Sequence, residues 1–225
     1  AIDILFIAYS KELLISSNGG KELLERILND KKIINENKVF NFDSEVFKYM
    51  VDTKSPQGII AVMKIPSNLI ENIDLSSDIV VLDKVQDTGN VGTIIRTADA
   101  FNIKNIICIE GTADIYSPKV IRSTMGSILR TNIITISENE FIEFKNKLKE
   151  LEYNIYATSL KNADSIDSIN FNKKNVVILG NEANGVSQRL IELSDKNIKI
   201  DMSNNTDSLN VSIAAGIIMH KMFKK

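Results

Sequence analysis

From residue 79 onward the chain repeats one pattern, in which a short apolar segment is followed by a segment with helical spacing. Most of the apolar segments carry no charge, as is typical of strands buried on both faces of a sheet. We expect such strands at residues 79–82, 105–109, 132–136, 154–158, 175–179 and 196–200. We expect helices at residues 91–101, 118–127, 138–151, 187–193 and 207–222. This alternation predicts an α/β fold, a mainly parallel sheet with helices on both faces.

The first part of the chain predicts a separate, small α/β unit. Strands are expected at residues 4–8 and 59–63, and a helix at residues 21–28, with a second helix beginning near Asp43 or Ser44. A polar segment with scattered aliphatic residues follows and is interpreted as a linker. The expected organisation is therefore a small domain at residues 1–65, a linker at 66–78 and a larger domain at 79–225. The chain begins inside an apolar run, so we expect the small domain to be truncated at its N-terminus.

Composition narrows the classes of protein that the chain can represent. No apolar run is long enough to cross a bilayer, and no signal segment is recognisable, so we expect a cytoplasmic protein. Cys108 is the only cysteine, which excludes an internal disulfide, and its apolar surroundings indicate a buried, reduced thiol. The net charge of −2 means that any nucleic acid must be attracted by a local basic patch. The best patch in the larger domain consists of Lys119, Arg122 and Arg130.

Ligands of parallel sheets bind at the carboxyl ends of the strands, so the segments that follow strands are the candidate sites. After the strand at 79–82 come Asn90, Gly92 and Arg96. Glycine at position 92 is interpreted as leaving room around Arg96, one helical turn away. Taken alone, Asn90 is better explained as a helix N-cap and Arg96 as a solvated surface residue.

Two further polar segments have the same relation to strands. Gly180, Glu182 and Gly185 follow the strand at 175–179, but lack the spacing of a dinucleotide-binding loop. Ser208 and Asn210 enter the last helix among apolar neighbours, and either Asp207 or Ser208 could be its cap. Each segment alone has a structural explanation: Glu182 can accept hydrogen bonds from nearby backbone, and Ser208 and Asn210 can satisfy local donors.

The order of these three segments resembles the three motifs of the SpoU-type (TrmH-like) RNA ribose methyltransferases, members of the SPOUT superfamily. The motifs are Asn90-x-Gly92-x-x-x-Arg96, Gly180-x-Glu182-x-x-Gly185 and residues 208–212. The segment from Lys119 to Gly126 also looks like the family's stretch between the first two motifs, and the small domain is similar to a ribosomal-protein-like RNA-binding domain. Two departures are Asp201, where family members have proline, and the Asn204-Asn205 region, where a glycine is common.

The resemblance implies a C-terminal trefoil knot, a homodimer with the active site at the interface, and S-adenosylmethionine as the cofactor, with no metal. Cofactor contacts are expected near Leu160, Gly180, Ile200, Met202 and Leu209. The reaction implied is in-line displacement, in which a ribose 2′-hydroxyl of rRNA or tRNA attacks the sulfonium methyl group.

The residues that the resemblance assigns to catalysis are Arg96, Asn90, Glu182, Ser208 and Asn210. We interpret Arg96 as a clamp on phosphate and on developing negative charge, because a guanidinium group is essentially never deprotonated in proteins. Methylation of a base by a SPOUT relative, or RNA binding without catalysis, are the alternatives. The last helix, apolar almost all round, agrees with a partner subunit but equally with burial inside one chain.

Overall fold

The structure, a computed structural model, describes residues 3–30, 37–66, 69–171, 174–203 and 208–224. The chain divides into two compact units, Ala1–Pro66 and Ser67–Lys225, called here the small unit and the sheet unit.

The small unit has a three-stranded sheet with β1 (Ile4–Tyr9) in the centre. It pairs in parallel with β2 (Val39–Asn41) and antiparallel with β3 (Ile59–Met63). The helices are α1 (Lys11–Ser16), α2 (Gly20–Asn29) and α4 (Ser44–Met50). The core is made by the buried side chains of Ile7, Ala8, Leu14, Leu24, Ile27 and Phe47. Neither α1 nor β2 was expected from the sequence, since both are too short to show a periodicity.

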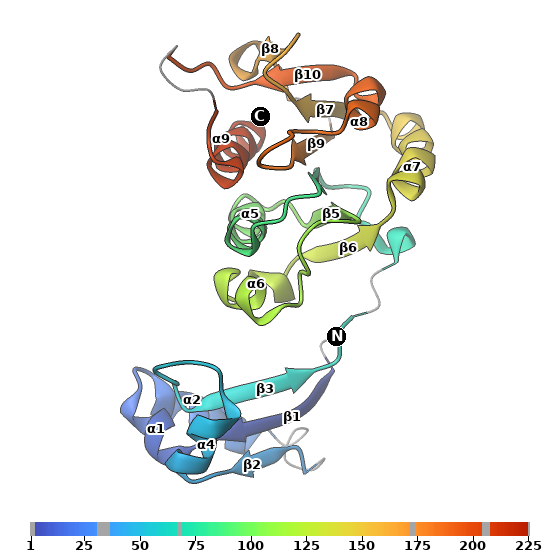
Figure 1. The fold of residues 1–225 in the computed structure, drawn as a ribbon. Coiled ribbons are helices and arrows are strands. Elements are labelled where there is room, and N and C mark those ends of the chain that lie inside the picture. The colour runs from blue at the N-terminus through green and yellow to red at the C-terminus, as the bar shows by residue number, and fades with distance from the viewer. Residues whose placement is uncertain (1–2, 31–36, 67–68, 172–173, 204–207, 225) are drawn as a thin grey trace. The chain divides into compact units, whose positions relative to one another are not determined.

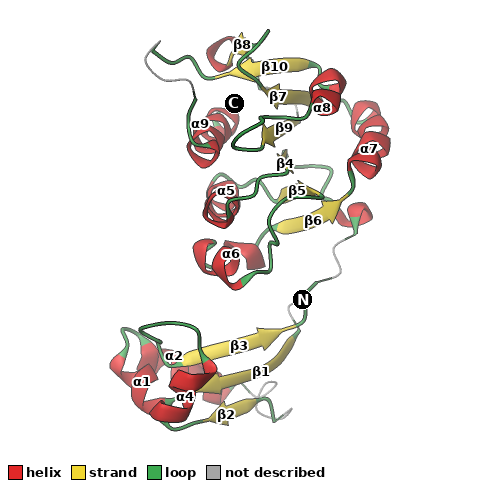
Figure 2. Ribbon diagram, in the orientation of Figure 1, coloured by secondary structure: helices red, strands yellow, loops and turns green. Residues whose placement is uncertain are grey.

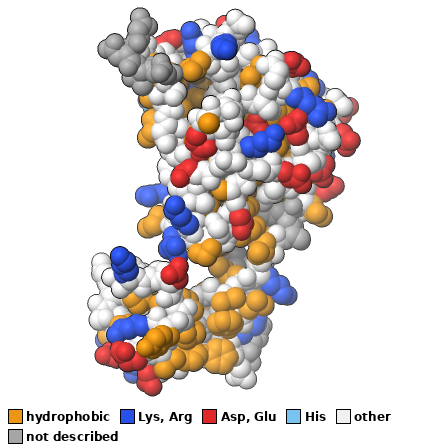
Figure 3. Space-filling view, in the orientation of Figure 1, with side chains coloured by type: hydrophobic (Ala, Val, Ile, Leu, Met, Phe, Trp, Pro, Cys, Tyr) orange, Lys and Arg blue, Asp and Glu red, His pale blue; other side chains and the backbone are white. Residues whose placement is uncertain are grey.

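Part of the small unit's apolar surface stays exposed. Leu5, Phe40 and Val62, one from each strand, are 42%, 48% and 36% exposed. Figure 3 shows hydrophobic side chains gathered over this unit. Gly58 closes the turn before β3 with φ +84°, and a Cβ there would lie 2.4 Å from the backbone nitrogen of Leu14. That turn therefore requires glycine.

The sheet unit contains seven strands in the order β6-β5-β4-β9-β7-β10-β8. Their bounds are β4 (Ile79–Asp83), β5 (Asn105–Ile109), β6 (Asn132–Ile136), β7 (Asn154–Thr158), β8 (Asp164–Ser165), β9 (Asn175–Gly180) and β10 (Lys196–Lys199). Every pairing between these strands is parallel. The predicted α/β class with a parallel sheet is confirmed.

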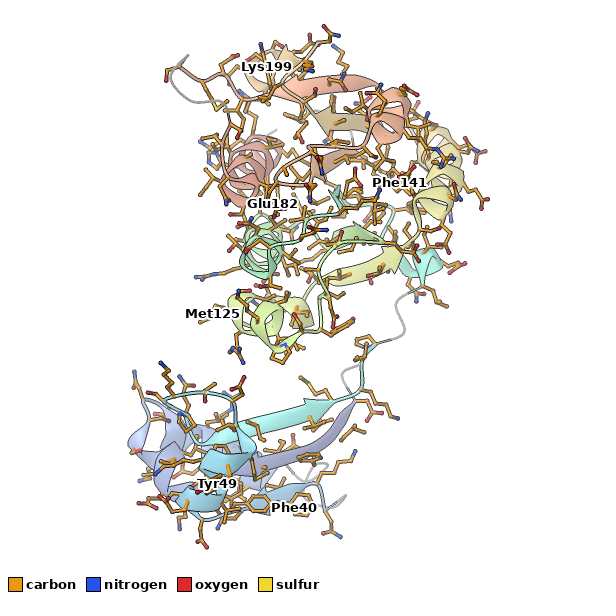
Figure 4. The ribbon with its side chains drawn as sticks, in the orientation of Figure 1. Phe40, Tyr49, Met125, Phe141, Glu182 and Lys199 are labelled. Atoms are coloured by element: carbon orange, nitrogen blue, oxygen red, sulfur yellow. The ribbon has the colours of Figure 1, made fainter. Side chains whose placement is uncertain are left out.

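Helices cover both faces of this sheet (Figures 1 and 2). One face packs against α5 (Thr88–Ala100), α6 (Pro118–Ser123) and α9 (Val211–Phe223), and the other against α7 (Glu138–Glu150) and α8 (Gln188–Leu193). Successive residues of β4 alternate between the two cores, with Val80 and Leu82 in one and Ile79 and Val81 in the other. Phe141, labelled in Figure 4, is one of two buried phenylalanines by which α7 packs on the second core, the other being Phe144. Burial on both faces explains why these strands are apolar throughout.

The end of one helix and the start of another differ from the sequence prediction. The helix expected at 118–127 ends at Ser123, because Met125 and Gly126 have φ of +49° and +84°, and a short 3₁₀ helix (Ser127–Leu129) follows. The last helix begins at Val211 rather than at 207, and Asp207 lies outside the described residues.

The expected linker also differs in its second half. Residues Ile70–Asn72 form a 3₁₀ helix, and Ile73 is buried in the sheet unit. The Asn105 side chain donates to the carbonyl of Asp74 at 2.8 Å and accepts from its N–H at 3.0 Å. This segment therefore packs on the sheet instead of passing freely between units.

Two compositional expectations can be compared with the structure. Cys108 lies buried on β5, and burial raises the pKa of its thiol to about 12, so it stays protonated. Among the described residues, no helix has the length and apolarity needed to cross a membrane.

Candidate functional site

The loop between β4 and α5 brings Asn90 to the carboxyl edge of the sheet. Asp87, not Asn90, is the N-cap of α5, and its side chain accepts a hydrogen bond from the backbone N–H of Asn90 at 2.8 Å. The interpretation of Asn90 as a cap is therefore wrong. Because Asp87 satisfies the helix terminus, the Asn90 side chain is available for other partners.

Asn90 joins all three sequence motifs through its side chain. Its Nδ2 donates to Glu182 Oε1 at 2.9 Å, and its Oδ1 accepts from Asn210 Nδ2 at 3.0 Å. Asn210 is the N-cap of α9, and its Oδ1 accepts from the N–H and the hydroxyl of Ser212 at 2.9 and 2.6 Å. We call the connected side chains of Glu182, Asn90 and Asn210 the amide relay. Figure 4 shows Glu182 between α5 and α9, which agrees with this connection.

Glu182 fixes the direction of the relay. Its carboxylate also accepts from the backbone N–H groups of Gln86 and Asp87, at 3.3 and 3.2 Å. Burial acts to raise the pKa of Glu182, but the hydrogen bonds from Asn90 and from backbone N–H groups outweigh it and lower the pKa. An ionised carboxylate only accepts, so Asn90 must present its amide nitrogen to Glu182 and its oxygen to Asn210.

The loop that carries Glu182 is held against β4 at two further points. Asn181 Nδ2 donates to the carbonyl of Lys84 at 2.9 Å, and the N–H of Ser187 donates to Asp83 Oδ2 at 2.6 Å. Asp83 is 1% exposed at the end of β4, and sequence reasoning missed it. The available signal was a carboxylate closing an otherwise apolar strand.

Two glycines of the motifs are explained by close packing. A Cβ at Gly92 would lie 1.8 Å from Ser123 Oγ of α6, so this glycine lets α5 and α6 approach each other. The structure explains Gly92 by this helix contact, and the room that it leaves around Arg96 stays a prediction. A Cβ at Gly180 would lie 2.1 Å from the carbonyl carbon of Gly185, because the loop after β9 folds back on itself.

Arg96 and Ser208 stand apart from the relay. Both side chains are exposed, and neither makes a hydrogen bond or ion pair with the residues that the structure describes. Of the predicted catalytic residues, the structure thus brings Asn90, Glu182 and Asn210 into contact and leaves the other two free of protein partners within the described chain.

The predicted cofactor residues come from three neighbouring strands and from the segment before α9. Strands β9, β7 and β10 lie side by side, so their carboxyl ends share one edge. Gly180 ends β9, Leu160 follows β7 and is 60% exposed, and Ile200, Met202 and Leu209 are half-buried. Apolar side chains left partly open at one edge of the sheet suit a flat aromatic ligand. Within the described ranges, no three His, Cys, Asp or Glu side chains group as metal ligands do.

The predicted basic patch is divided in two. Lys119 and Arg122 are exposed on α6, and neither forms an ion pair with any residue described. Arg130 instead pairs with Asp99, its Nη2 2.7 Å from Oδ2. Burial acts to raise the pKa of Asp99, but hydrogen bonds from Arg130, Ser127 and Lys104 outweigh it and lower the pKa. Arg130 is therefore partly neutralised and fixes the end of the 3₁₀ helix to α5.

Comparison with known proteins places these features in one family. The SpoU rRNA methylase family matches residues 77–220, which include the whole amide relay. The chain belongs to this family. RlmP of Bacillus subtilis, a 23S rRNA (guanosine(2553)-2′-O)-methyltransferase, is 31% identical over 81% of the chain and 71% of its own length. A 23S rRNA (uridine(2479)-2′-O)-methyltransferase of Streptomyces viridochromogenes is 27% identical over 76% of the chain, which spans only 62% of that relative.

Solved structures of SpoU and rRNA methyltransferases have the same fold. An rRNA methyltransferase from Sinorhizobium meliloti superposes with a TM-score of 0.85 and 25% identity. The superposition covers 100% of this chain and 81% of the chain from Sinorhizobium meliloti. The SpoU methyltransferase AviRb from Streptomyces viridochromogenes gives a TM-score of 0.83 at 22% identity, covering 100% and 82%. The second likeness shows the fold alone.

One face of α9 in this SpoU methylase is open. Ile213, Ile217 and Phe223 are 54%, 38% and 58% exposed, while Ala215, Ile218 and Met219 are buried against the sheet and α5. His220 lies on the open face beside Phe101, with ring centroids 5.6 Å apart. The helix is therefore not buried on all sides by its own described chain.

Proposed function

We propose that this chain transfers a methyl group from S-adenosylmethionine to a ribose 2′-hydroxyl of RNA. The observation that carries the proposal is the amide relay, which connects the loops after β4 and β9 to the start of α9. The relatives from Bacillus subtilis and Streptomyces viridochromogenes are named as 2′-O-methyltransferases of 23S rRNA. Their target nucleosides differ, so they do not fix the nucleotide that this chain methylates in rRNA or tRNA.

The cofactor site that we propose lies at the ends of β9, β7 and β10. Leu160, Ile200, Met202 and Leu209 would enclose the adenine, with backbone groups near Gly180 supplying hydrogen bonds. The rRNA methyltransferase from Sinorhizobium meliloti has been solved with AdoMet bound, at a TM-score of 0.84 and 25% identity. When bound, this cofactor supplies a methyl group already activated by its sulfonium charge.

The chain's own residues would align the ribose and stabilise negative charge as it develops on the attacking oxygen. Arg96 supplies a planar, permanently charged group for phosphate and that oxygen. Ser208 orients the ribose, and the amide relay connects α5, which carries Arg96, to the loop after β9 and to the start of α9. No metal has a part in this proposal.

We further propose a homodimer in which the open face of α9 is covered by a second copy and the active site lies at the interface. Exposed aliphatic and aromatic side chains along one helix face favour such a contact. The C-terminal segment that returns from β10 to α9 would be threaded as a trefoil knot, as the resemblance implies. Lys119 and Arg122 would contact phosphates, and the small unit would bind RNA outside the target nucleotide.

The proposal is tested with radiolabelled S-adenosylmethionine and total RNA. We expect label in one RNA species, at a position that resists alkaline cleavage because its 2′-oxygen is blocked. Label at an alkali-sensitive position indicates base methylation instead. Cofactor binding in calorimetry without transfer to any RNA contradicts the proposal. Replacing Arg96 with lysine should lower the single-turnover rate, and an unchanged rate across the pH profile would exclude a planar clamp.

A further inference from the structure

Met125 is the most exposed large apolar side chain in the described part of the sheet unit, at 70%. Its backbone has φ +49°, in the left-handed region that costs a non-glycine residue about 1–2 kcal/mol. Figure 4 shows Met125 at the outer edge of the unit, on the segment that follows α6. The chain thus adopts an unfavourable backbone conformation that presents an apolar side chain to solvent.

The residues on either side hold Met125 in this position. Thr124 is fully buried, and its hydroxyl donates to the carbonyl of Ile121 at 2.8 Å. Ser127 is 3% exposed, its Oγ accepts from Arg130 at 3.1 Å, and its carbonyl accepts from Thr131. Because both anchors are packed, the exposure of Met125 does not result from a loose loop.

The surroundings of Met125 combine apolar and basic side chains. Ile121 and Leu129 are 42% and 48% exposed. Lys119 and Arg122 lie on the same short helix without an ion pair among the described residues. Figure 3 shows basic side chains together along the edge of the unit where α5 and α6 lie. We call Ile121, Met125 and Leu129 the methionine surface.

We propose that the methionine surface packs against an unstacked nucleobase of the RNA, next to phosphates held by Lys119 and Arg122. A methionine sulfur contacts aromatic rings favourably, and its flexible side chain adapts to any base. Proteins that unstack bases insert apolar side chains beside basic residues in this way. The inference rests on the proposed function, since it assigns a base contact to the same RNA substrate.

RNA fits this surface better than a second copy of the chain. A subunit interface that buried Lys119 and Arg122 would need carboxylates opposite both, and lysine is depleted in interface cores. RNA supplies phosphates for the two cations and a flat apolar face for Met125 at once.

The test compares variants in RNA binding at several salt concentrations. The probes are an oligoadenylate about 20 nucleotides long and an abasic ribose-phosphate oligomer of equal length, followed by fluorescence anisotropy. We expect M125A and M125G to bind the oligoadenylate about five- to tenfold more weakly than wild type. The abasic oligomer should bind all three equally, and the salt dependence should stay unchanged. R122A should instead weaken binding to both probes and reduce the salt slope by about 1.

Two controls keep the result interpretable. M125G is expected to fold because glycine adopts positive φ without strain, which thermal unfolding checks. L69A removes another apolar side chain of the sheet unit, 59% exposed, and should bind as wild type.

Equal oligoadenylate affinities for wild type, M125A and M125G refute the base contact. The base contact is also refuted if wild type sediments as a dimer and M125A as a monomer in analytical ultracentrifugation, since the methionine surface would then be a subunit contact. The proposed function fails separately, if wild type methylates no RNA.

Discussion

The direction of the amide relay can be reversed by exchanging its two ends. In wild type, Glu182 only accepts, so Asn90 donates to it and accepts from Asn210. In the double variant E182Q/N210D, the carboxylate stands at position 210 and the amide at position 182. Rotation of the Asn90 amide then allows it to accept from position 182 and donate to position 210. Net charge and the two hydrogen bonds within the relay are preserved, but the N–H of Asp87 loses its acceptor, because in wild type it shares Glu182 Oε1 with Asn90.

Each single variant, by contrast, breaks the order of donors and acceptors. E182Q weakens three hydrogen bonds to a charged but exposed group, which should lower the free energy of unfolding by about 1 kcal/mol. N210D still caps α9 through Ser212, but it sets an acceptor against Asn90 Oδ1, at a cost of about 1–1.5 kcal/mol. The double variant should lie within about 1 kcal/mol of wild type, because only the hydrogen bond from Asp87 is lost, which gives a coupling energy of about 1–1.5 kcal/mol.

Urea unfolding measures the coupling, and single-turnover methyl transfer measures its effect on the reaction. Each single variant should lower the rate about 10- to 100-fold through misplacement of the loops, and the double variant should recover it. N210S, which keeps a capping oxygen but removes the amide that donates to Asn90, is the matched control. The relay is refuted if the loss of unfolding free energy in the double variant equals the sum of the losses in the two single variants. Recovered stability without recovered rate shows that the charge of Glu182 itself is needed.

Three further predictions follow from close packing and charge. G92A places a Cβ 1.8 Å from Ser123 Oγ, so the free energy of unfolding in denaturant should fall by about 1–3 kcal/mol, and S123G should restore it. G180A places a Cβ 2.1 Å from the backbone of Gly185, so the melting temperature should fall. Because the clash is with backbone, no second side-chain substitution should restore it. The folded pKa of Asp99 is lowered, so its stabilisation is present above the unfolded pKa and lost as pH falls through the folded value. Urea midpoints of wild type and D99N should therefore differ at neutral pH and converge below about pH 4; a constant difference contradicts the pairing.

The sequence was sufficient for the sheet because burial on both faces leaves a signal in every strand. All five residues of β4 are buried, and its neighbours β5 and β9 are equally enclosed. Where that signal is short, prediction failed: β2 has three residues and β8 two. The end of α6 could not be predicted either, because the left-handed turn at Met125 is held by the burial of its neighbours and not by its own propensity.

The candidate site was predictable in its residues but not in its connections. The order of polar segments after strands pointed to Asn90, Glu182 and Asn210. Asn90 is separated along the chain from Glu182 by 92 residues and from Asn210 by 120, and no local pattern indicates which side chain donates. The contact of Gly92 with Ser123 also joins two separate helices, so no local pattern in the sequence indicated it.

The relay also limits which residues can meet the substrate. Asn90 has both ends of its amide in hydrogen bonds, and Asn210 has its oxygen committed to Ser212 and its nitrogen to Asn90. Each amide nitrogen keeps a second N–H, so a ribose that contacts the relay meets only groups whose direction the protein already fixes. Arg96 and Ser208 have no such partner within the described residues, so their polar groups can be desolvated by RNA and receive new bonds in return. Substitutions in the relay should therefore change the rate and stability together, whereas those at Arg96 and Ser208 should change the rate alone.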